Sequence, residues 1–185
     1  MPTRYDPPDG PADRVAIIGP GRAYSPANPL LEFARLALLQ HGWTVQQLWW
    51  DEPEDIAPDW PAEQVRAAVE AESCEQVLVV GKSLGTRASP YAARRGLPAI
   101  WLTPLLVDAE CVAGIRDNPA PQLLVGGLDD QFWDTDVAAG LAGPDREVVE
   151  IPGADHAMCV PGDAIRSAEI HVEVSRAIDT FLSRW

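Results

Sequence analysis

The chain has 185 residues, 46% of them hydrophobic and 23% charged, which is typical of a globular protein with a sizeable core. Its formal net charge of −14 argues against nucleic acid and against an anionic membrane as partners, because phosphate binding needs clustered lysine and arginine side chains. No apolar run approaches the length of a membrane-spanning helix.

The cysteines and the first residues bear on cofactors and organisation. Cys74, Cys111 and Cys159 are odd in number and widely spaced, which fits neither a disulfide framework nor a zinc site. We therefore expect no metal, no other cofactor and a reduced, cytoplasmic setting. Residues 1–13 are polar and rich in proline, without the apolar core of a signal peptide. They are expected to form a flexible leader before a single domain over residues 14–185.

Short apolar runs alternate with stretches of helical periodicity along the rest of the chain. The expected strands cover residues 14–21, 44–49, 75–81, 97–103, 121–127 and 146–153. The expected helices cover residues 28–43, 61–72, 83–96, 108–117, 136–143 and 162–185, with Pro90 interrupting or bending the third. Six buried strands joined by helices predict an α/β fold with a doubly wound, mostly parallel six-stranded sheet covered by helices on both faces.

Three residues of complementary chemistry follow three of these strands. In open α/β sheets, sites form at the carboxyl ends of the strands. Ser83, Asp129 and His156 each come directly after a predicted strand, so the topology brings them to one edge of the sheet.

Ser83 lies in the sequence GKSLG, a G-x-S-x-G pattern between a predicted strand and a predicted helix. Small residues on either side let the backbone turn sharply and present the serine as a nucleophile. A plain strand-to-helix turn is the alternative, while the Walker phosphate-binding pattern is not matched. Lys82, beside the serine, is expected to turn its side chain away.

His156 is the one histidine expected on a loop, since His41 and His171 fall in predicted helices. A serine hydroxyl needs a base with a pKa near the working pH, and imidazole is such a base. A carboxylate must then orient the imidazole, and Asp129 and Asp130 both follow the strand at 121–127. The chain order serine, aspartate, histidine is that of the α/β-hydrolases.

With these motifs, the chain resembles a small α/β-hydrolase without a lid, similar to the dienelactone-hydrolase and esterase branch. The resemblance covers nearly everything after the leader and rests on GKSLG, on LLVGGLDD and on IPGADHAM around His156. In that family the acid follows a glycine such as Gly126 by three residues, which favours Asp129. The family's oxyanion hole maps to the backbone N–H groups of Arg22 and Leu84.

The resemblance also points to what the chain lacks. The antiparallel strands that usually open the family's sheet and a cap domain are both expected to be missing, which leaves a shallow, open site. Aromatic residues near the strand ends are candidates for an apolar substrate pocket, with core packing as the alternative. These candidates are Tyr24, Trp49, Trp50, Trp101, Phe132 and Trp133.

The function implied is that of a serine hydrolase that cleaves a carboxylic ester or thioester of a small-molecule acyl substrate through an acyl-serine intermediate. One alternative is a non-catalytic binding protein with the same fold, because fold does not imply function. Another is a flavodoxin-like ligand binder, which does not explain why Ser83, Asp129 and His156 share one edge. The sequence leaves the oligomeric state and the identity of the substrate open.

Overall fold

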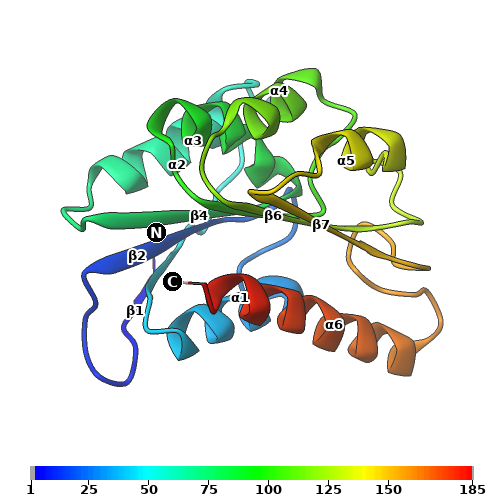
Figure 1. The fold of residues 1–185 in the computed structure, drawn as a ribbon, viewed down its shortest axis with the longest axis horizontal. Helices are drawn as coiled ribbons and strands as arrows, with labels where there is room; N and C mark the ends of the chain where they lie inside the picture. Colours follow the sequence, from blue (N-terminus) through cyan, green and yellow to red (C-terminus); the bar gives the residue numbers. More distant parts are fainter. Residues whose placement is uncertain (1–2, 185) are drawn as a thin grey trace.

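A computed structural model describes residues 3–184, which form one seven-stranded sheet between two layers of helices (Figure 1). The strands are β1 Thr3–Tyr5, β2 Arg14–Gly19, β3 Thr44–Gln47, β4 Gln76–Lys82, β5 Ala99–Leu102, β6 Gln122–Gly127 and β7 Arg146–Ile151. The α-helices are α1 Pro29–Gln40, α2 Trp60–Glu70, α3 Ser89–Arg95, α4 Ala109–Asp117, α5 Thr135–Leu141 and α6 Ala164–Leu182. The sheet order is β1-β3-β2-β4-β5-β6-β7, and every neighbouring pair except β1–β3 is parallel.

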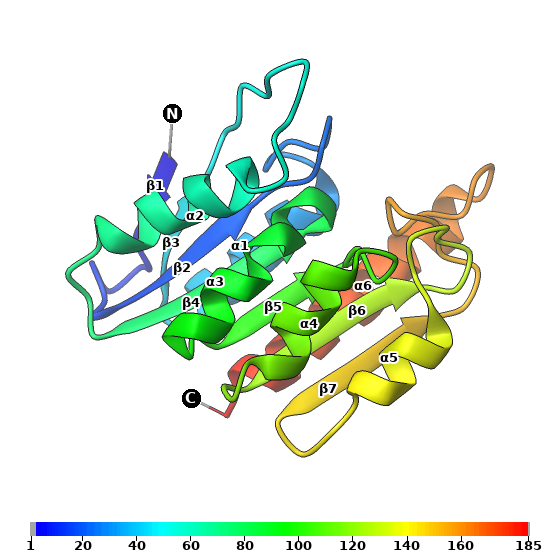
Figure 2. The ribbon, with the colours of Figure 1, turned by 90° about the horizontal axis from the view of Figure 1, so that it is seen from above.

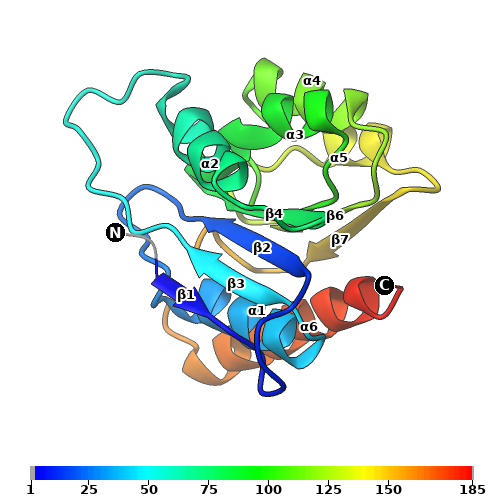
Figure 3. The ribbon, with the colours of Figure 1, turned by 90° about the vertical axis from the view of Figure 1, so that its left-hand side faces the viewer.

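Each face of the sheet has its own apolar core. Successive side chains of a strand point to opposite faces, so Leu78 and Val80 of β4 pack towards α1 and α6, while Val79 packs towards α2 and α3. Figures 2 and 3 show α2, α3, α4 and α5 over one face and α1 and α6 over the other. The continuous apolar runs of β2, β4, β5 and β6 are therefore strands buried on both sides, whereas the edge strand β7 is mostly half-buried. The predicted doubly wound sheet is confirmed.

Local sequence signals set several helix boundaries. The side chains of Asp108, Asp134 and Asp163 accept hydrogen bonds from backbone N–H groups at the first turns of α4, α5 and α6. The third predicted helix is divided, because residues Ser83–Ala88 form a 3₁₀ turn (η1) and the α-helix begins only at Ser89. Pro90 lies in the first turn of that helix, where its missing N–H costs nothing.

The edge of the sheet differs from the prediction of six strands and a loose leader. Thr3–Tyr5 pair antiparallel with β3 and add a seventh strand from within the predicted leader. The segment that follows is also held, because Thr44 Oγ1 donates to Asp6 and accepts from the Ala12 N–H. The sequence of β1 is short and polar and shows no apolar alternation, so no sequence pattern predicts a strand there. Residues 1–2 of that leader and Trp185, the end of the last predicted helix, lie outside the described residues.

The topology determines where a site can form. Strands β4, β6 and β7 run parallel, so their carboxyl ends, and the loops that follow them, lie at the same edge of the sheet. The loops after these three strands carry the serine, the aspartates and the histidine singled out in the sequence.

Candidate active site

Ser83 occupies a sharp turn between β4 and the 3₁₀ turn η1. Its φ of 50° lies in the left-handed region, which is uncommon for a residue with a side chain. The flanking glycines are needed because a Cβ on Gly85 would lie 2.3 Å from the carbonyl oxygen of Gly19, and one on Gly81 would lie 2.7 Å from that of Gly85. The strained backbone and the close packing together match the geometry of a nucleophile elbow.

His156 reaches Ser83 from the loop between β7 and α6. Its Nε2 lies 2.7 Å from Ser83 Oγ, within hydrogen-bond distance. Asp155 shapes this loop, since its Oδ1 accepts from the backbone N–H groups of Ala157 and Cys159 at 2.8 Å and 2.9 Å. The Phe132 ring packs against the imidazole in a T-shaped arrangement, with 4.8 Å between the ring centroids. The histidine predicted to face the serine therefore does so.

The carboxylate that meets the histidine is Asp130, and the prediction of Asp129 is wrong. Asp130 Oδ2 lies 2.7 Å from His156 Nδ1, and its Oδ1 accepts from the Phe132 N–H at 2.9 Å. The reason is a turn after β6, in which the Asp130 N–H donates to the Gly127 carbonyl at 3.2 Å. This turn puts Asp129 at the exposed corner and returns Asp130 to the interior, where its side chain is fully buried.

Asp130, His156 and Ser83 form a continuous hydrogen-bonded chain, which we call the relay. A carboxylate on Nδ1 holds the proton at that nitrogen and leaves the Nε2 lone pair directed at the serine hydroxyl. Ser83 is 8% exposed, and the His156 side chain is 26% exposed. The hydroxyl is therefore partly sheltered from water and is in contact with a base that solvent can still reach.

Gly127→Ala is expected to disrupt this relay and to destabilise the protein. A Cβ there would lie 2.0 Å from the backbone oxygen of Ala154, two residues before His156, so one of the two segments must move. We expect a loss of about 3 kcal/mol in the free energy of unfolding, as for severe overpacking, together with a large loss of activity. Urea unfolding and initial rates measure the two effects.

Gly140→Ala is the matched control for that substitution. Gly140 lies within α5 with no atom near the position of an added Cβ. Alanine should therefore stabilise the helix by up to about 1 kcal/mol. Equal stabilities for the two variants would contradict the close packing of Gly127 on Ala154.

The two segments predicted to supply oxyanion donors both lie against Ser83. Leu84 is in the first turn of η1, where backbone N–H groups have no acceptor within the helix. Arg22 belongs to the loop after β2, and a Cβ on its neighbour Gly21 would lie 3.2 Å from Ser83 Cβ. The side chain of Lys82, expected to point away from the site, instead packs beneath this loop and is only 2% exposed.

The six aromatic residues predicted to line a pocket lie in three places, and the first is the contact of Phe132 with His156 already described. Tyr24, Trp49 and Trp50 line a hollow of about 190 Å³ that shares Gly21 with the surroundings of Ser83. Trp101 and Trp133 were expected in the pocket but belong to the core beneath α2–α5, where they are 0% and 8% exposed.

The two core tryptophans fill space that small residues leave. The indole of Trp101 lies over Gly81, and that of Trp133 lies over Gly126. The Trp101 N–H donates to Gln122 and the Trp133 N–H donates to Glu150, each at 2.9 Å. Both rings are therefore held in the core by packing and by a hydrogen bond.

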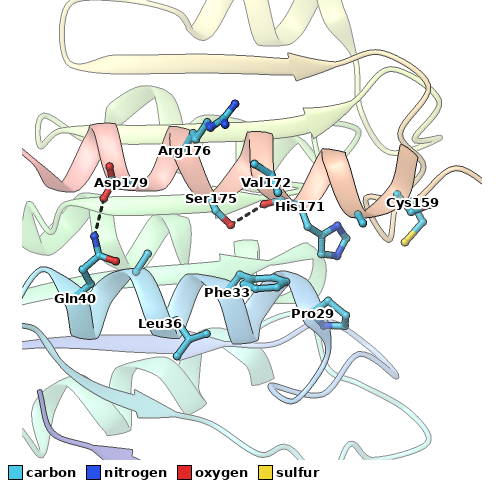
Figure 4. Close-up of a pocket in the computed structure, with 13 residues that line it drawn as sticks. Pro29, Phe33, Leu36, Gln40, Cys159, His171, Val172, Ser175, Arg176 and Asp179 are labelled. Atoms are coloured by element: carbon cyan, nitrogen blue, oxygen red, sulfur yellow. Dashed lines mark hydrogen bonds between the residues drawn. The ribbon is translucent and has the colours of Figure 1, made fainter. Parts of the chain in front are cut away.

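A larger hollow of about 790 Å³ lies between α1 and α6 (Figure 4). Its lining includes Phe33, Val172 and His171, and none of the three relay side chains contributes to it. The Phe33 and His171 rings meet edge to face, with centroids 6.2 Å apart. No sequence pattern predicts this groove, since most of its residues are ordinary positions on two amphipathic helices.

Neither a metal centre nor a membrane span is found in the part of the chain that the structure describes. Residues 3–184 bring no three His, Cys, Asp or Glu side chains together in a way that could hold a metal ion. Among the same residues, no helix is both long and apolar enough to cross a bilayer.

Solved structures with the same architecture identify the fold. A serine hydrolase without a lid from Xanthomonas campestris aligns over 100% of this chain and 88% of its own, with a TM-score of 0.72 and 19% identity. A serine hydrolase homologue from Coxiella burnetii aligns over 95% and 89%, with a TM-score of 0.74 and 16% identity. The chain has the α/β-hydrolase fold. Est1E from Butyrivibrio proteoclasticus, solved with ferulic acid bound, shares this fold over 100% and 94% of the two chains, with a TM-score of 0.78 and 14% identity.

The predicted likeness to small α/β-hydrolases without a lid is therefore confirmed at the level of the fold. No family model and no curated protein sequence matches the chain. Within the α/β-hydrolase fold, the segment between β5 and β6 holds only α4, so Ser83 has no additional domain above it in the described residues.

Proposed function

We propose that the protein is a serine hydrolase that cleaves a carboxylic ester or thioester through an acyl-serine intermediate. The observation that carries the proposal is the relay from Asp130 through His156 to Ser83, with 2.7 Å at each contact. The α/β-hydrolase fold supports it, because this fold presents a serine, an acid and a histidine in the same chain order. The alternative of a binding protein that has lost turnover does not require this complete relay.

The relay supports a two-step reaction. His156 Nε2 takes the hydroxyl proton as Ser83 Oγ attacks the acyl carbon, and Asp130 stabilises the imidazolium that forms. The backbone N–H groups of Arg22 and Leu84 stabilise the negative oxygen. The bond to the leaving group then breaks, and that group receives the proton from Nε2. Water attacks the acyl-serine with His156 again as base, which releases the carboxylic acid and restores Ser83.

The surroundings of Ser83 suggest the size of the acyl group. The hollow that meets these surroundings at Gly21 is small, about 190 Å³, and its lining includes Tyr24, Trp49 and Trp50. Est1E, which shares the fold, binds ferulic acid. We propose a small-molecule substrate with a short or aromatic acyl group and no metal or other cofactor.

The acidic composition supports a protein that binds neither nucleic acid nor membrane, and the three free cysteines support a cytoplasmic setting.

A fluorophosphonate probe tests the proposed function directly. The probe phosphonylates an activated serine, so we expect covalent label on the native protein and, after digestion, on the peptide that contains Ser83. Mass spectrometry locates the label, and protein unfolded in urea is the control, because its relay is lost. Label on another residue, or equal labelling of native and unfolded protein, would exclude the proposed nucleophile.

A panel of esters and thioesters then assigns the substrate class. Chromogenic esters of short aliphatic and aromatic acids are compared with the matching thioesters by kcat/KM. Turnover of the panel by labelled, inactivated protein should be absent. A native protein that takes the probe but turns over none of these acyl compounds would favour a different acyl substrate over the one proposed.

A further inference from the structure

Lys82 is the only lysine in the chain, and it is buried next to Ser83. Thirteen arginines supply the remaining cationic side chains, counted without the histidines. Lys82 is the last residue of β4 and is 2% exposed, an uncommon place for an ammonium group. The two-step reaction described above gives it no role.

The aliphatic part of Lys82 supports the loop after β2. A Cβ on Gly21 would lie 2.8 Å from Lys82 Cδ, so the loop backbone rests directly on the lysine side chain. The ammonium Nζ lies 4.5 Å from the centre of the Tyr24 ring, within the range of a cation–π interaction. Lys82 therefore contacts both ends of the short segment from Gly21 to Tyr24.

Apart from Lys82, the segment is held by the packing of Tyr24 against the core and by a few long hydrogen bonds. The Tyr24 N–H donates to the Gly21 carbonyl over a long 3.4 Å, and Ala23 has a φ of 49°. The Ala23 N–H donates to the Glu52 carboxylate at 3.3 Å. Arg22, whose N–H is the proposed oxyanion donor, lies in the middle of the segment, and its position depends on how well the ends are fixed.

Tyr24 links the segment to the rest of the protein. Its hydroxyl accepts from the Leu30 N–H at 3.3 Å, in the first turn of α1. The Lys82 ammonium contacts the Tyr24 ring. Within the described range 3–184, this ammonium has no hydrogen bond or ion pair. The ring and the ammonium therefore hold one another between the helix and the strand.

The charges that face Lys82 come from two further loops. Asp130, after β6, and Asp155, after β7, both favour the ammonium form. Burial opposes them and dominates, and it lowers the pKa of Lys82 from 10.5 to about 8. Burial also raises the pKa of Tyr24 to about 12, so the tyrosine stays neutral while the lysine titrates.

We propose that Lys82 is a positioning residue whose ammonium holds the Tyr24 ring and thereby keeps the Gly21–Tyr24 loop aimed at the acyl oxygen. The inference rests on the proposed acyl transfer at Ser83. Lys82 touches no reacting atom in this role and acts through the loop. Loss of the charge should therefore weaken transition-state stabilisation and leave the affinity for substrate nearly unchanged.

Lys82→Met removes the charge and keeps an unbranched apolar side chain under Gly21. Loss of a whole oxyanion donor costs about 10²–10³ in rate, so a loosened donor should cost about tenfold in kcat with little change in KM. Arg94→Met is the matched control, since it removes a positive charge from an exposed position on α3 and should change neither value. A kcat equal to that of the wild type for Lys82→Met would overturn the proposal.

A double-mutant cycle with Tyr24→Leu tests whether the ring transmits the effect. Tyr24→Leu should also lower kcat, and the combined variant should be no slower than the worse single variant, because both substitutions break the same contact. Tyr24→Phe keeps the ring and should lose less than Tyr24→Leu. Independent, multiplicative losses in the cycle would overturn the assigned contact.

The pH dependence separates positioning from a merely structural role. Wild-type kcat should fall as pH rises through about 8, where Lys82 loses its proton, and Lys82→Met should lack this decline. Because the chain has one lysine, isotope-labelled lysine gives one side-chain NMR signal, and its titration should have the same midpoint. A decline that persists in Lys82→Met would contradict the assignment.

Stability provides a second separation. The folded pKa lies below the ordinary value, so the buried ammonium destabilises the wild type below about pH 8, and this cost is relieved as pH rises towards 10.5. Lys82→Met should therefore need more urea to unfold at pH 7 although its kcat is lower. A parallel loss of stability and kcat would indicate a structural role only. Failure of the proposed function would appear differently, as a wild-type protein that the fluorophosphonate does not label.

Discussion

Ser83→Ala is expected to lower kcat for the best ester in the panel by about 10⁶-fold, the loss that follows removal of the nucleophile in serine hydrolases. The substitution removes the side-chain oxygen from a residue that is 8% exposed. Within residues 3–184, the one side-chain hydrogen bond of Ser83 is that to His156. The fold should therefore be retained, which circular dichroism and urea unfolding will show. Covalent labelling by the fluorophosphonate should disappear with the same substitution.

The matched control for the nucleophile is Ser73→Ala. Ser73 is an exposed serine in the loop before β4, and its loss should leave turnover and labelling as they are in the wild type. Retention of a substantial part of the activity in Ser83→Ala, measured on protein free of other hydrolases, would show that another group attacks the substrate.

Asp130→Asn should lower kcat by about 10⁴-fold, the loss expected when the orienting acid of such a relay is replaced by an amide. The asparagine amide donates a hydrogen bond to Nδ1, where the carboxylate accepted one. His156 is therefore held in the tautomer that carries its proton on Nε2. In that tautomer the imidazole cannot take the proton of Ser83. Initial rates across the pH range measure the effect.

Asp129→Asn makes the comparison specific. Asp129 precedes Asp130 and has an exposed side chain. Its backbone N–H donates to the Ala154 carbonyl, and asparagine at this position keeps that hydrogen bond. We expect activity close to that of the wild type. Equal losses in the two variants, or a larger loss for Asp129→Asn, would contradict the geometry of the turn after β6.

The strands, and the order in which the serine, the aspartates and the histidine follow them, could be predicted from sequence because they depend on local composition. Runs such as residues 77–81 are apolar throughout, as a strand covered on both faces requires. The glycines beside Ser83 likewise report a close backbone approach. Strand β1 could not be found in this way, since Thr3–Tyr5 is short and polar and is defined only by its partner β3.

The choice between Asp129 and Asp130 depends on a property that sequence spacing does not contain. One residue of difference in the turn decides which carboxylate points inward, and that turn is closed by a hydrogen bond to Gly127. The prediction that Trp101 and Trp133 line the pocket is wrong for a related reason. Trp101 lies near the end of a strand, but its face of the sheet is set by register with the neighbouring strand, where Gly81 leaves room for the ring.

The short strand β1 also bears on how the molecule avoids aggregation. Without it, the edge of β3 would present a row of unpaired backbone groups to other copies of the chain. With it, the outer edge is three residues long, carries Arg4, and is followed by Pro7 and Pro8, which offer no N–H. The opposite edge, β7, carries Glu147 and Glu150. Both margins of the sheet are thus poor templates for another strand.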